Sequence, residues 1–258
     1  MNIAVCVKQI PDPATPYELD PDTRFVVRPD DQILDDTDRY GIEVGLQLAE
    51  ASQGSVTAIS MGPAGTMNGI RQALAMGADK AVVIDDEVLR GSGALVTARV
   101  LAAAVQREGC ELVIAGTEST DGYSGVVPQQ MAEILGVPAL TYARKVEVEG
   151  DRIVIEQQTA VGYDVVEARM PAVLSVTAGV VEPRYPTFKG IMSAKKKPMD
   201  RLTAADLGFS AESVGTAGSG QRIASVEQAP GRDAGRIIED EGEAHLEIIE
   251  MLERAKVI

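Results

Sequence analysis

Short apolar runs alternate, through the first half of the chain, with segments whose apolar residues recur at helical spacing. A short apolar run between turn residues is typical of a buried strand, and apolar residues three and four positions apart mark one face of a helix. Such alternation predicts a doubly wound α/β sheet of parallel strands, with its ligand site at the carboxyl ends of the strands. The predicted strands are 2–8, 54–61, 78–84 and 111–116, and the predicted helices are 38–51, 64–76, 92–107 and 124–135.

The pattern changes to antiparallel β structure after residue 136. Residues 141–148 and 152–158 flank a Glu-Gly-Asp turn, which predicts a hairpin. Residues 163–169 and 171–177 predict another pair of strands. The fold class is therefore α/β, a doubly wound and mainly parallel sheet with antiparallel additions.

The apolar density falls in the last quarter of the chain, where Pro, Lys and Gly become more frequent. We therefore expect an α/β domain over residues 1–194 and a C-terminal arm over residues 195–258. The arm shows little periodicity between 198 and 240 and ends in an amphipathic helix predicted over 241–257. Because such a helix needs a surface to cover its apolar face, we expect it to pack on a partner subunit.

Composition and charge exclude several classes of protein. The chain has 258 residues, 45% of them hydrophobic, which is enough for a folded core. Its net charge of −15 repels a phosphate backbone, so we do not expect nucleic acid as a partner. The absence of a long uncharged apolar run and of a basic leader predicts a cytoplasmic protein without membrane insertion. Cys6 and Cys110 lack metal or redox spacing and suit reduced core cysteines.

The segment from Gly116 to Gln129 is the most informative loop, because it leaves a predicted strand and enters a helix through glycines and hydroxyl residues. Backbone N–H groups at a helix N-terminus attract anions, and small residues let a phosphate approach them. The same residues also fit an ordinary helix capped by Asp121 or Ser124, and the loop matches neither GxGxxG nor the P-loop. Lys8, at the end of the first strand, either meets a phosphate or flavin in the cleft or is a solvated lysine.

No catalytic constellation is visible in the sequence. His245 is the only histidine, and no CxxC motif is present, so zinc ligation and Ser/His or Cys/His catalysis have no support. We expect a binding protein with neither catalytic residues nor a metal site.

The basic run 195–197 either attracts an acidic surface or is solvated. Phe188, in the Pro- and Gly-containing loop before it, suggests an exposed anchor for a partner.

Several motifs, in the same order along nearly the whole chain, resemble the beta subunit of electron-transfer flavoprotein. The most specific of them is the segment with EPRY, GIM and AKKK. The motifs are VCVKQIPD at 5–12, ALAMGADKA at 73–81, the loop 116–129, PAVLSVTAGVVEPRYPTFKGIMSAKKK at 171–197, and DLG at 206–208.

The resemblance implies a Rossmann-like fold of the adenine nucleotide-binding type and a heterodimer with an alpha subunit. That subunit would hold the redox-active FAD, while this chain binds its own nucleotide, usually AMP. The pair would be an electron carrier, not an enzyme, that serves dehydrogenases such as acyl-CoA dehydrogenase in fatty acid oxidation and a quinone oxidoreductase as respiratory acceptor. Together with Lys8, the implied nucleotide contacts, with the phosphate at 121–127, are Cys6 (main chain), Asp35, Asp36, Thr37, Asp38, Met61, Gly116, Thr117, Glu118, Ser119, Thr120, Asp121, Gly122, Tyr123, Ser124, Gly125, Val126 and Val127.

The recognition loop of the family maps to residues 177–198. Phe188 stands where an apolar residue, commonly leucine, inserts into a pocket on the partner dehydrogenase. The implied partner-docking residues are Glu182, Pro183, Arg184, Tyr185, Phe188, Ile191 and Met192.

The chain departs from the family pattern at positions that bear on the cofactor. Gln157-Gln158 and Pro13 replace an acidic and an aromatic residue of many relatives, which leaves contacts to the alpha-subunit flavin open. Electron-bifurcating members carry DGDTAQVGPQ, whereas residues 121–130 read DGYSGVVPQQ. Tyr123 and Val126 replace residues that can hydrogen-bond a diphosphate, which favours AMP. The alternatives are a bifurcating subunit that binds a second FAD in place of AMP and oxidises NADH, and an adenine nucleotide-sensing module without a redox role.

Overall fold

The computed structural model describes residues 1–227, 235–240 and 242–258, which form two compact units, Met1–Ile223 and Ala224–Ile258. Every predicted strand and helix is present, with ends displaced by a few residues. The strands are β1 (Asn2–Cys6), β2 (Gln9–Ile10), β3 (Ile33–Leu34), β4 (Ser55–Met61), β5 (Lys80–Ile84), β6 (Leu112–Gly116), β7 (Ala139–Glu149), β8 (Arg152–Gln158), β9 (Tyr163–Arg169), β10 (Ala172–Val176) and β11 (Met199–Leu202). The α-helices are α1 (Asp38–Ser52), α2 (Asn68–Met76), α3 (Ala94–Glu108), α4 (Val127–Leu135), α5 (Phe188–Ala194), α6 (Gly215–Ser219) and α7 (Ala244–Arg254), and the 3₁₀ turns are η1 (Glu87–Leu89), η2 (Ala205–Leu207) and η3 (Ala211–Ser213).

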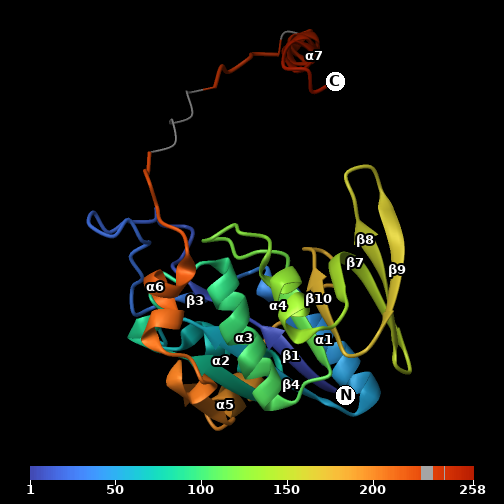
Figure 1. Ribbon diagram of the computed structural model, residues 1–258. Helices are drawn as coiled ribbons and strands as arrows, with labels where there is room; N and C mark the ends of the chain where they lie inside the picture. Colours follow the sequence, from blue (N-terminus) through green and yellow to red (C-terminus); the bar gives the residue numbers. More distant parts are fainter. Residues whose placement is uncertain (228–234, 241) are drawn as a thin grey trace. The chain divides into compact units, whose positions relative to one another are not determined.

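The first unit is built on one sheet with the strand order β11-β5-β4-β1-β6-β10-β7-β8-β9 (Figure 1). Neighbouring strands from β11 to β7 run parallel, and β8 and β9 extend the sheet in antiparallel fashion. Helices cover both faces of the parallel part. The prediction of a doubly wound, mainly parallel α/β sheet with antiparallel additions is confirmed.

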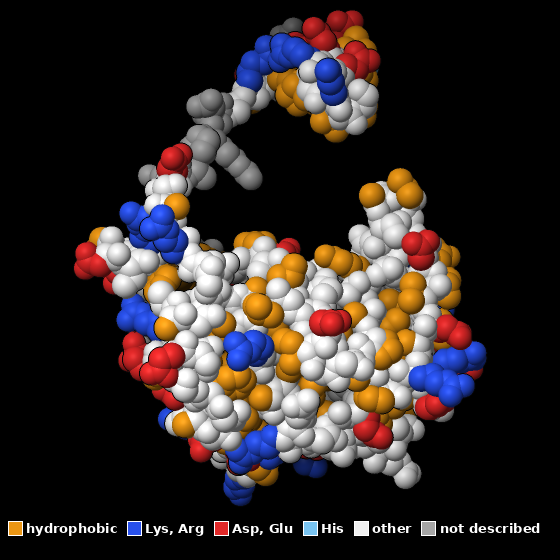
Figure 2. Space-filling model, in the orientation of Figure 1, with side chains coloured by type: hydrophobic (Ala, Val, Ile, Leu, Met, Phe, Trp, Pro, Cys, Tyr) orange, Lys and Arg blue, Asp and Glu red, His pale blue; other side chains and the backbone are white. Residues whose placement is uncertain are grey.

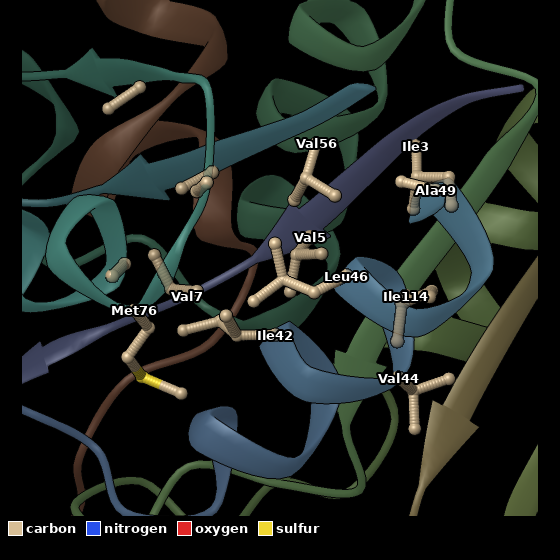
Figure 3. Close-up of a cluster of buried hydrophobic side chains, with 14 of the residues drawn as sticks. Ile3, Val5, Val7, Ile42, Val44, Leu46, Ala49, Val56, Met76 and Ile114 are labelled. Atoms are coloured by element: carbon tan, nitrogen blue, oxygen red, sulfur yellow. The ribbon is translucent and has the colours of Figure 1, made fainter. Parts of the chain in front are cut away.

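Alternate residues of β1 enter the two layers of the core. Ile3 and Val5 pack with α1 and α2, whereas Ala4 and Cys6 pack with α3 and α4. Figure 3 shows the first of these layers, where Ile42 of α1 lies near Val5. A Cβ atom at Gly45 would lie only 2.9 Å from the Val5 side chain, so a glycine lets α1 approach the strand closely.

The strand β10 is placed differently from its prediction. Residues 171–177 were expected to pair with 163–169, but β10 lies between β6 and β7 and is parallel to both, while β9 pairs with β8. All five residues of β10 are buried. A strand buried on both faces has a continuous apolar run in place of an alternating one, which is typical of the centre of a parallel sheet.

The first unit also extends beyond the boundary expected at Ala194. The strand β11 pairs in parallel with β5 at the edge of the sheet, and Leu202 and Val214 are buried in the layer that contains α3. These contacts carry the compact unit to Ile223. Of the expected arm, residues 228–234 and 241 lie outside the described residues.

The second unit contains α7, which falls within the predicted 241–257 helix and has no buried residue. Leu246, Ile248, Ile249 and Met251 expose large hydrophobic side chains on it. Its packing on a partner subunit stays a prediction. Within the described residues, we find no helix with the length and apolar character that a membrane span requires.

Candidate functional site

A cleft of about 1080 Å³ opens where β1, β4, β5 and β6 end, with Cys6, Met61 and Gly116 among its lining residues. This is the edge at which parallel α/β sheets bind their ligands. The loop between β6 and α4 forms one wall, and the residues between η1 and α3 form another. The prediction of a cleft at the carboxyl ends of the strands is therefore met by the structure.

Asp35 lies outside the cleft lining and holds two neighbouring segments together through its carboxylate. Its carboxylate accepts hydrogen bonds from the main-chain N–H and the hydroxyl of Thr120, at 2.7 and 3.0 Å. The same carboxylate accepts the N–H and hydroxyl of Thr37, at 3.1 and 2.8 Å. Because Asp35 is fully buried and its hydrogen bonds join the start of α1 to the β6–α4 loop, it fixes the position of this loop.

Asp121 follows Thr120 in the β6–α4 loop, and its side chain is only 1% exposed. Lys8 Nζ lies 2.6 Å from its Oδ1, and Arg28 Nη2 forms an ion pair with its Oδ2. Burial raises the pKa of Asp121, but the two cations outweigh burial and leave the pKa below its usual value. Asp121 is therefore a charged residue that draws Lys8 and Arg28 together.

Asp38, in the first turn of α1, holds the backbone of Lys8. Its Oδ2 accepts the main-chain N–H of Lys8 at 2.6 Å. Burial, and after it the neighbouring Asp35 carboxylate, raises the pKa of Asp38 well above its usual value. Burial likewise raises the pKa of the Cys6 thiol to about 12, so this cysteine is an unreactive part of the wall at neutral pH.

The start of α4 lies at the cleft, which Val126, Val127 and Pro128 line, and Pro128 itself has no N–H to donate. The N-cap of this helix is Val126, and no side chain caps it, so the alternative of a helix capped by Asp121 or Ser124 is wrong. The reason is that α4 begins only at Val127, while Asp121 is occupied by two cations. The first N–H groups of a helix have no acceptor within it. The Oε1 atom of Gln130, a residue that lines the cleft, is buried without a hydrogen-bond partner among the described residues.

Most of the predicted nucleotide contacts line this cleft. Two of the exceptions are exposed: Asp36 lies beside Arg39, and Tyr123 is 68% exposed. The residues that line the cleft are Cys6, Lys8, Asp38, Met61, Gly116, Thr117, Glu118, Ser119, Asp121, Gly122, Ser124, Gly125, Val126 and Val127, and those that do not are Asp35, Asp36, Thr37, Thr120 and Tyr123.

Sequence reasoning missed several parts of the cleft lining, among them Arg28 and the segment before α3. Arg28 comes from an irregular stretch without periodicity, so no signal pointed to it. The Gly91–Ala94 segment lines the cleft at the start of α3. Its Gly-Ser-Gly sequence before a helix is the same kind of signal that singled out the β6–α4 loop, and could have been used.

The predicted recognition loop lies on α1 and α2 and is not part of the cleft. Tyr185 and Phe188 are 77% and 81% exposed, and Ile191 and Met192 are about half exposed. Arg184 is less exposed than these residues and is paired with α1, with Nε 2.7 Å from Glu43. We refer to residues 182–197 as the docking segment.

The far end of the docking segment is also fixed. Lys197 Nζ donates to the carbonyl oxygens of Leu74, Gly77 and Ala78 at the end of α2, at 2.9, 3.1 and 2.6 Å. One lysine of the basic run thus anchors the segment, while Lys195 and Lys196 are exposed.

Comparisons with known proteins place these features in a family. A model described as electron transfer flavoprotein domain matches residues 23–207. The chain is 42% identical to electron transfer flavoprotein subunit beta of Mycobacterium tuberculosis (strain ATCC 25618 / H37Rv), over 100% of this chain and 99% of that one. It is 34% identical to the protein of the same name from Megasphaera elsdenii, over 100% of both chains. It is 31% identical, over 92% of each chain, to the caffeyl-CoA reductase-Etf complex subunit CarD of Acetobacterium woodii.

Proposed function

Since this chain belongs to the electron transfer flavoprotein family as a beta subunit, we propose that it binds AMP in its cleft and forms the non-catalytic half of a heterodimeric electron carrier. The observation that carries the nucleotide assignment is that the uncapped start of α4 lines the same cleft as Lys8 and Arg28. Backbone donors and two cations in one cleft suit a phosphate group. The buried Oε1 of Gln130 is an acceptor for a donor group of the same ligand.

AMP fits this donor set better than a second FAD does. Lys8, Arg28 and the start of α4 line the cleft and supply donors for one phosphate group, whereas Tyr123 is 68% exposed, does not line the cleft and supplies no donor for a diphosphate. The cleft, at about 1080 Å³, is slightly larger than most small-molecule sites, so its size alone does not distinguish the two nucleotides. AMP has no redox chemistry, and its role is to hold the walls of the cleft together.

The alpha subunit holds most of the redox-active FAD, which accepts and passes on electrons, and this chain supplies part of the wall of that site. Two surfaces support the need for such a partner. The strand β9 is a free sheet edge with Val165 70% exposed, and Val161, in the turn before it, is 99% exposed. Figure 2 shows exposed hydrophobic side chains at the tip of this extension. Among the residues that the structure describes, no side chain of α7 is buried, so its apolar face is left exposed.

Dehydrogenases, with acyl-CoA dehydrogenase as the expected example, dock on the exposed apolar side chains of the docking segment, and a quinone oxidoreductase takes up the electrons. Phe188 is the central anchor, and Lys189, Lys195 and Lys196 around it suit an acidic partner surface. An interface of one buried anchor with charged surroundings is small, and a small interface allows the fast exchange that an electron carrier needs.

Co-expression with a tagged alpha subunit tests this function. The chain should co-purify with the alpha subunit in a one-to-one complex, and the flavin of that complex should bleach when acyl-CoA dehydrogenase and its substrate are added without oxygen. A folded, nucleotide-bound chain that neither joins the alpha subunit nor carries flavin would instead support the nucleotide-sensing module.

The bifurcating alternative has one observation in its favour, the similarity to a subunit of the caffeyl-CoA reductase-Etf complex. It requires a second FAD in the cleft and oxidation of NADH. Addition of NADH alone to the purified complex separates the two accounts, since the AMP-binding carrier should not be reduced by it.

A further inference from the structure

The strands β2 and β3 form a separate two-stranded sheet, and the segment between them forms one wall of the cleft. Its ends are joined where Gln9 pairs with Leu34 and Ile10 with Ile33. Residues 24–28 of this segment line the cleft. None of the nucleotide contacts predicted from the sequence lies in it, so this wall has no assigned role.

Arg28 connects this wall to the β6–α4 loop through Asp121. Its Nη2 pairs with Asp121, and its Nη1 donates to the carbonyl oxygen of Gln9 at 3.4 Å and to Oε1 of Gln32 at 3.3 Å. Gln32 is itself only 2% exposed. The guanidinium is therefore fixed by groups from three parts of the chain before any ligand arrives.

The ion pairs with Asp121 leave positive charge and N–H donors on Lys8 and Arg28 that a ligand can use. Lys8 and Arg28 share one carboxylate, and their side chains are 34% and 26% exposed in the cleft that both line. A guanidinium has five N–H donors, and among the described residues no acceptor uses the Nε–H of Arg28. Arg28 thus retains both charge and donors for a ligand anion.

We propose that Arg28 is a binding residue for the phosphate of the adenine nucleotide, and that Asp121 is the internal carboxylate that holds Arg28 and Lys8 in place for it. The proposal rests on the proposed function, which puts the nucleotide in this cleft. A planar guanidinium matches two phosphate oxygens at once, and a lysine cannot do so. Arg28 therefore recognises the phosphate and not the adenosine.

Binding of AMP and of adenosine to the heterodimer, after its bound nucleotide has been removed, separates these two contributions. The variants are Arg28→Met, Arg28→Lys and the control Arg71→Met, which removes an exposed arginine of α2 outside the cleft lining. Arg28→Met should weaken AMP binding by about tenfold to a hundredfold, since a hydrogen bond to a charged group is lost. Adenosine binding should stay within about twofold of the wild type, and Arg28→Lys should lie between.

Three results would overturn the assignment, each in a distinct way. Equal AMP affinity of Arg28→Met and Arg71→Met would remove Arg28 from the binding site. An equal loss of AMP and adenosine binding would make Arg28 a structural residue. If Arg28→Met fails to assemble, Arg28→Lys replaces it in the test. A ratio of AMP affinity to adenosine affinity equal to that of the wild type would then remove Arg28 from phosphate binding, and a lower ratio would support it. A wild-type heterodimer that binds neither ligand would refute the nucleotide site of the proposed function, and the role of Arg28 with it.

Discussion

Replacement of Arg184 by methionine should both destabilise the protein and loosen the docking segment. The guanidinium donates to Glu43, whose side chain is 4% exposed, and to Glu50, which is 60% exposed. Loss of the bonds to the buried carboxylate costs about 1.5–3 kcal/mol, while the exposed pair adds less than about 1 kcal/mol. Because Arg184 is itself 36% exposed, water replaces part of these contacts. We therefore expect a decrease of about 2 kcal/mol in the free energy of unfolding.

The pH dependence of this decrease follows from Glu43. Burial raises the pKa of Glu43, but hydrogen bonds from Arg184 and Gln47 outweigh burial and leave it below the ordinary value of 4.5. A carboxyl whose pKa is lowered on folding contributes its stability above its ordinary pKa and loses it as the pH falls through the folded pKa. The difference in melting temperature between wild type and Arg184→Met should be full at pH 7 and shrink below pH 4.5.

Thermal melting of the heterodimer, together with the kinetics of flavin reduction by a dehydrogenase, measures both effects. Arg184→Met should lower the melting temperature by several degrees and raise the KM for the dehydrogenase more than it lowers kcat, because a loose segment must be ordered before docking. Glu50→Gln is the matched control and should lie within about 1 kcal/mol of the wild type. Unchanged melting and unchanged KM in Arg184→Met would refute the role of Arg184 as an anchor.

Three further substitutions test other parts of the structure. Phe188→Ala should reduce electron transfer from the dehydrogenase while the bound cofactors remain; normal flavin reduction by every dehydrogenase tested would contradict the docking assignment. Lys197→Met should speed hydrogen exchange over α5, because three carbonyl contacts are lost, whereas the exposed Lys195→Met should not; equal exchange in both would show that Lys197 is no anchor. Gly45→Val should cost about 1–3 kcal/mol through overpacking against Val5, and an unchanged melting temperature would disprove the close approach of α1.

The sequence predicted those parts of the fold that depend on local periodicity. The helices α1 and α3 and the strands β4 to β6 have clear apolar patterns, and their alternation determines the sheet type. The place of β10 was not predictable in this way, because strand order depends on which apolar surfaces meet after the chain folds. The short β11 has only one buried residue, Leu202, so the pattern gave no strand signal there.

The candidate site shows the same division. The glycines and hydroxyls of the β6–α4 loop indicated an anion site, because backbone donors at a helix start depend on local sequence. The pairing of Asp121 with Lys8 and Arg28 joins residues more than ninety positions apart, and no local pattern encodes it. For the same reason the pairing of Arg184 with Glu43 and Glu50 of α1, more than 130 positions earlier, was not predicted, while its role in docking stays a prediction.

The nucleotide content of the heterodimer tests the central claim most directly. The complex, purified after co-expression with the alpha subunit, is denatured, and the released nucleotides are separated and quantified per heterodimer. Our account predicts one AMP and one FAD, with the AMP bound in the cleft beside Lys8 and Arg28. Two FAD molecules and no AMP would contradict it and move redox chemistry into this subunit.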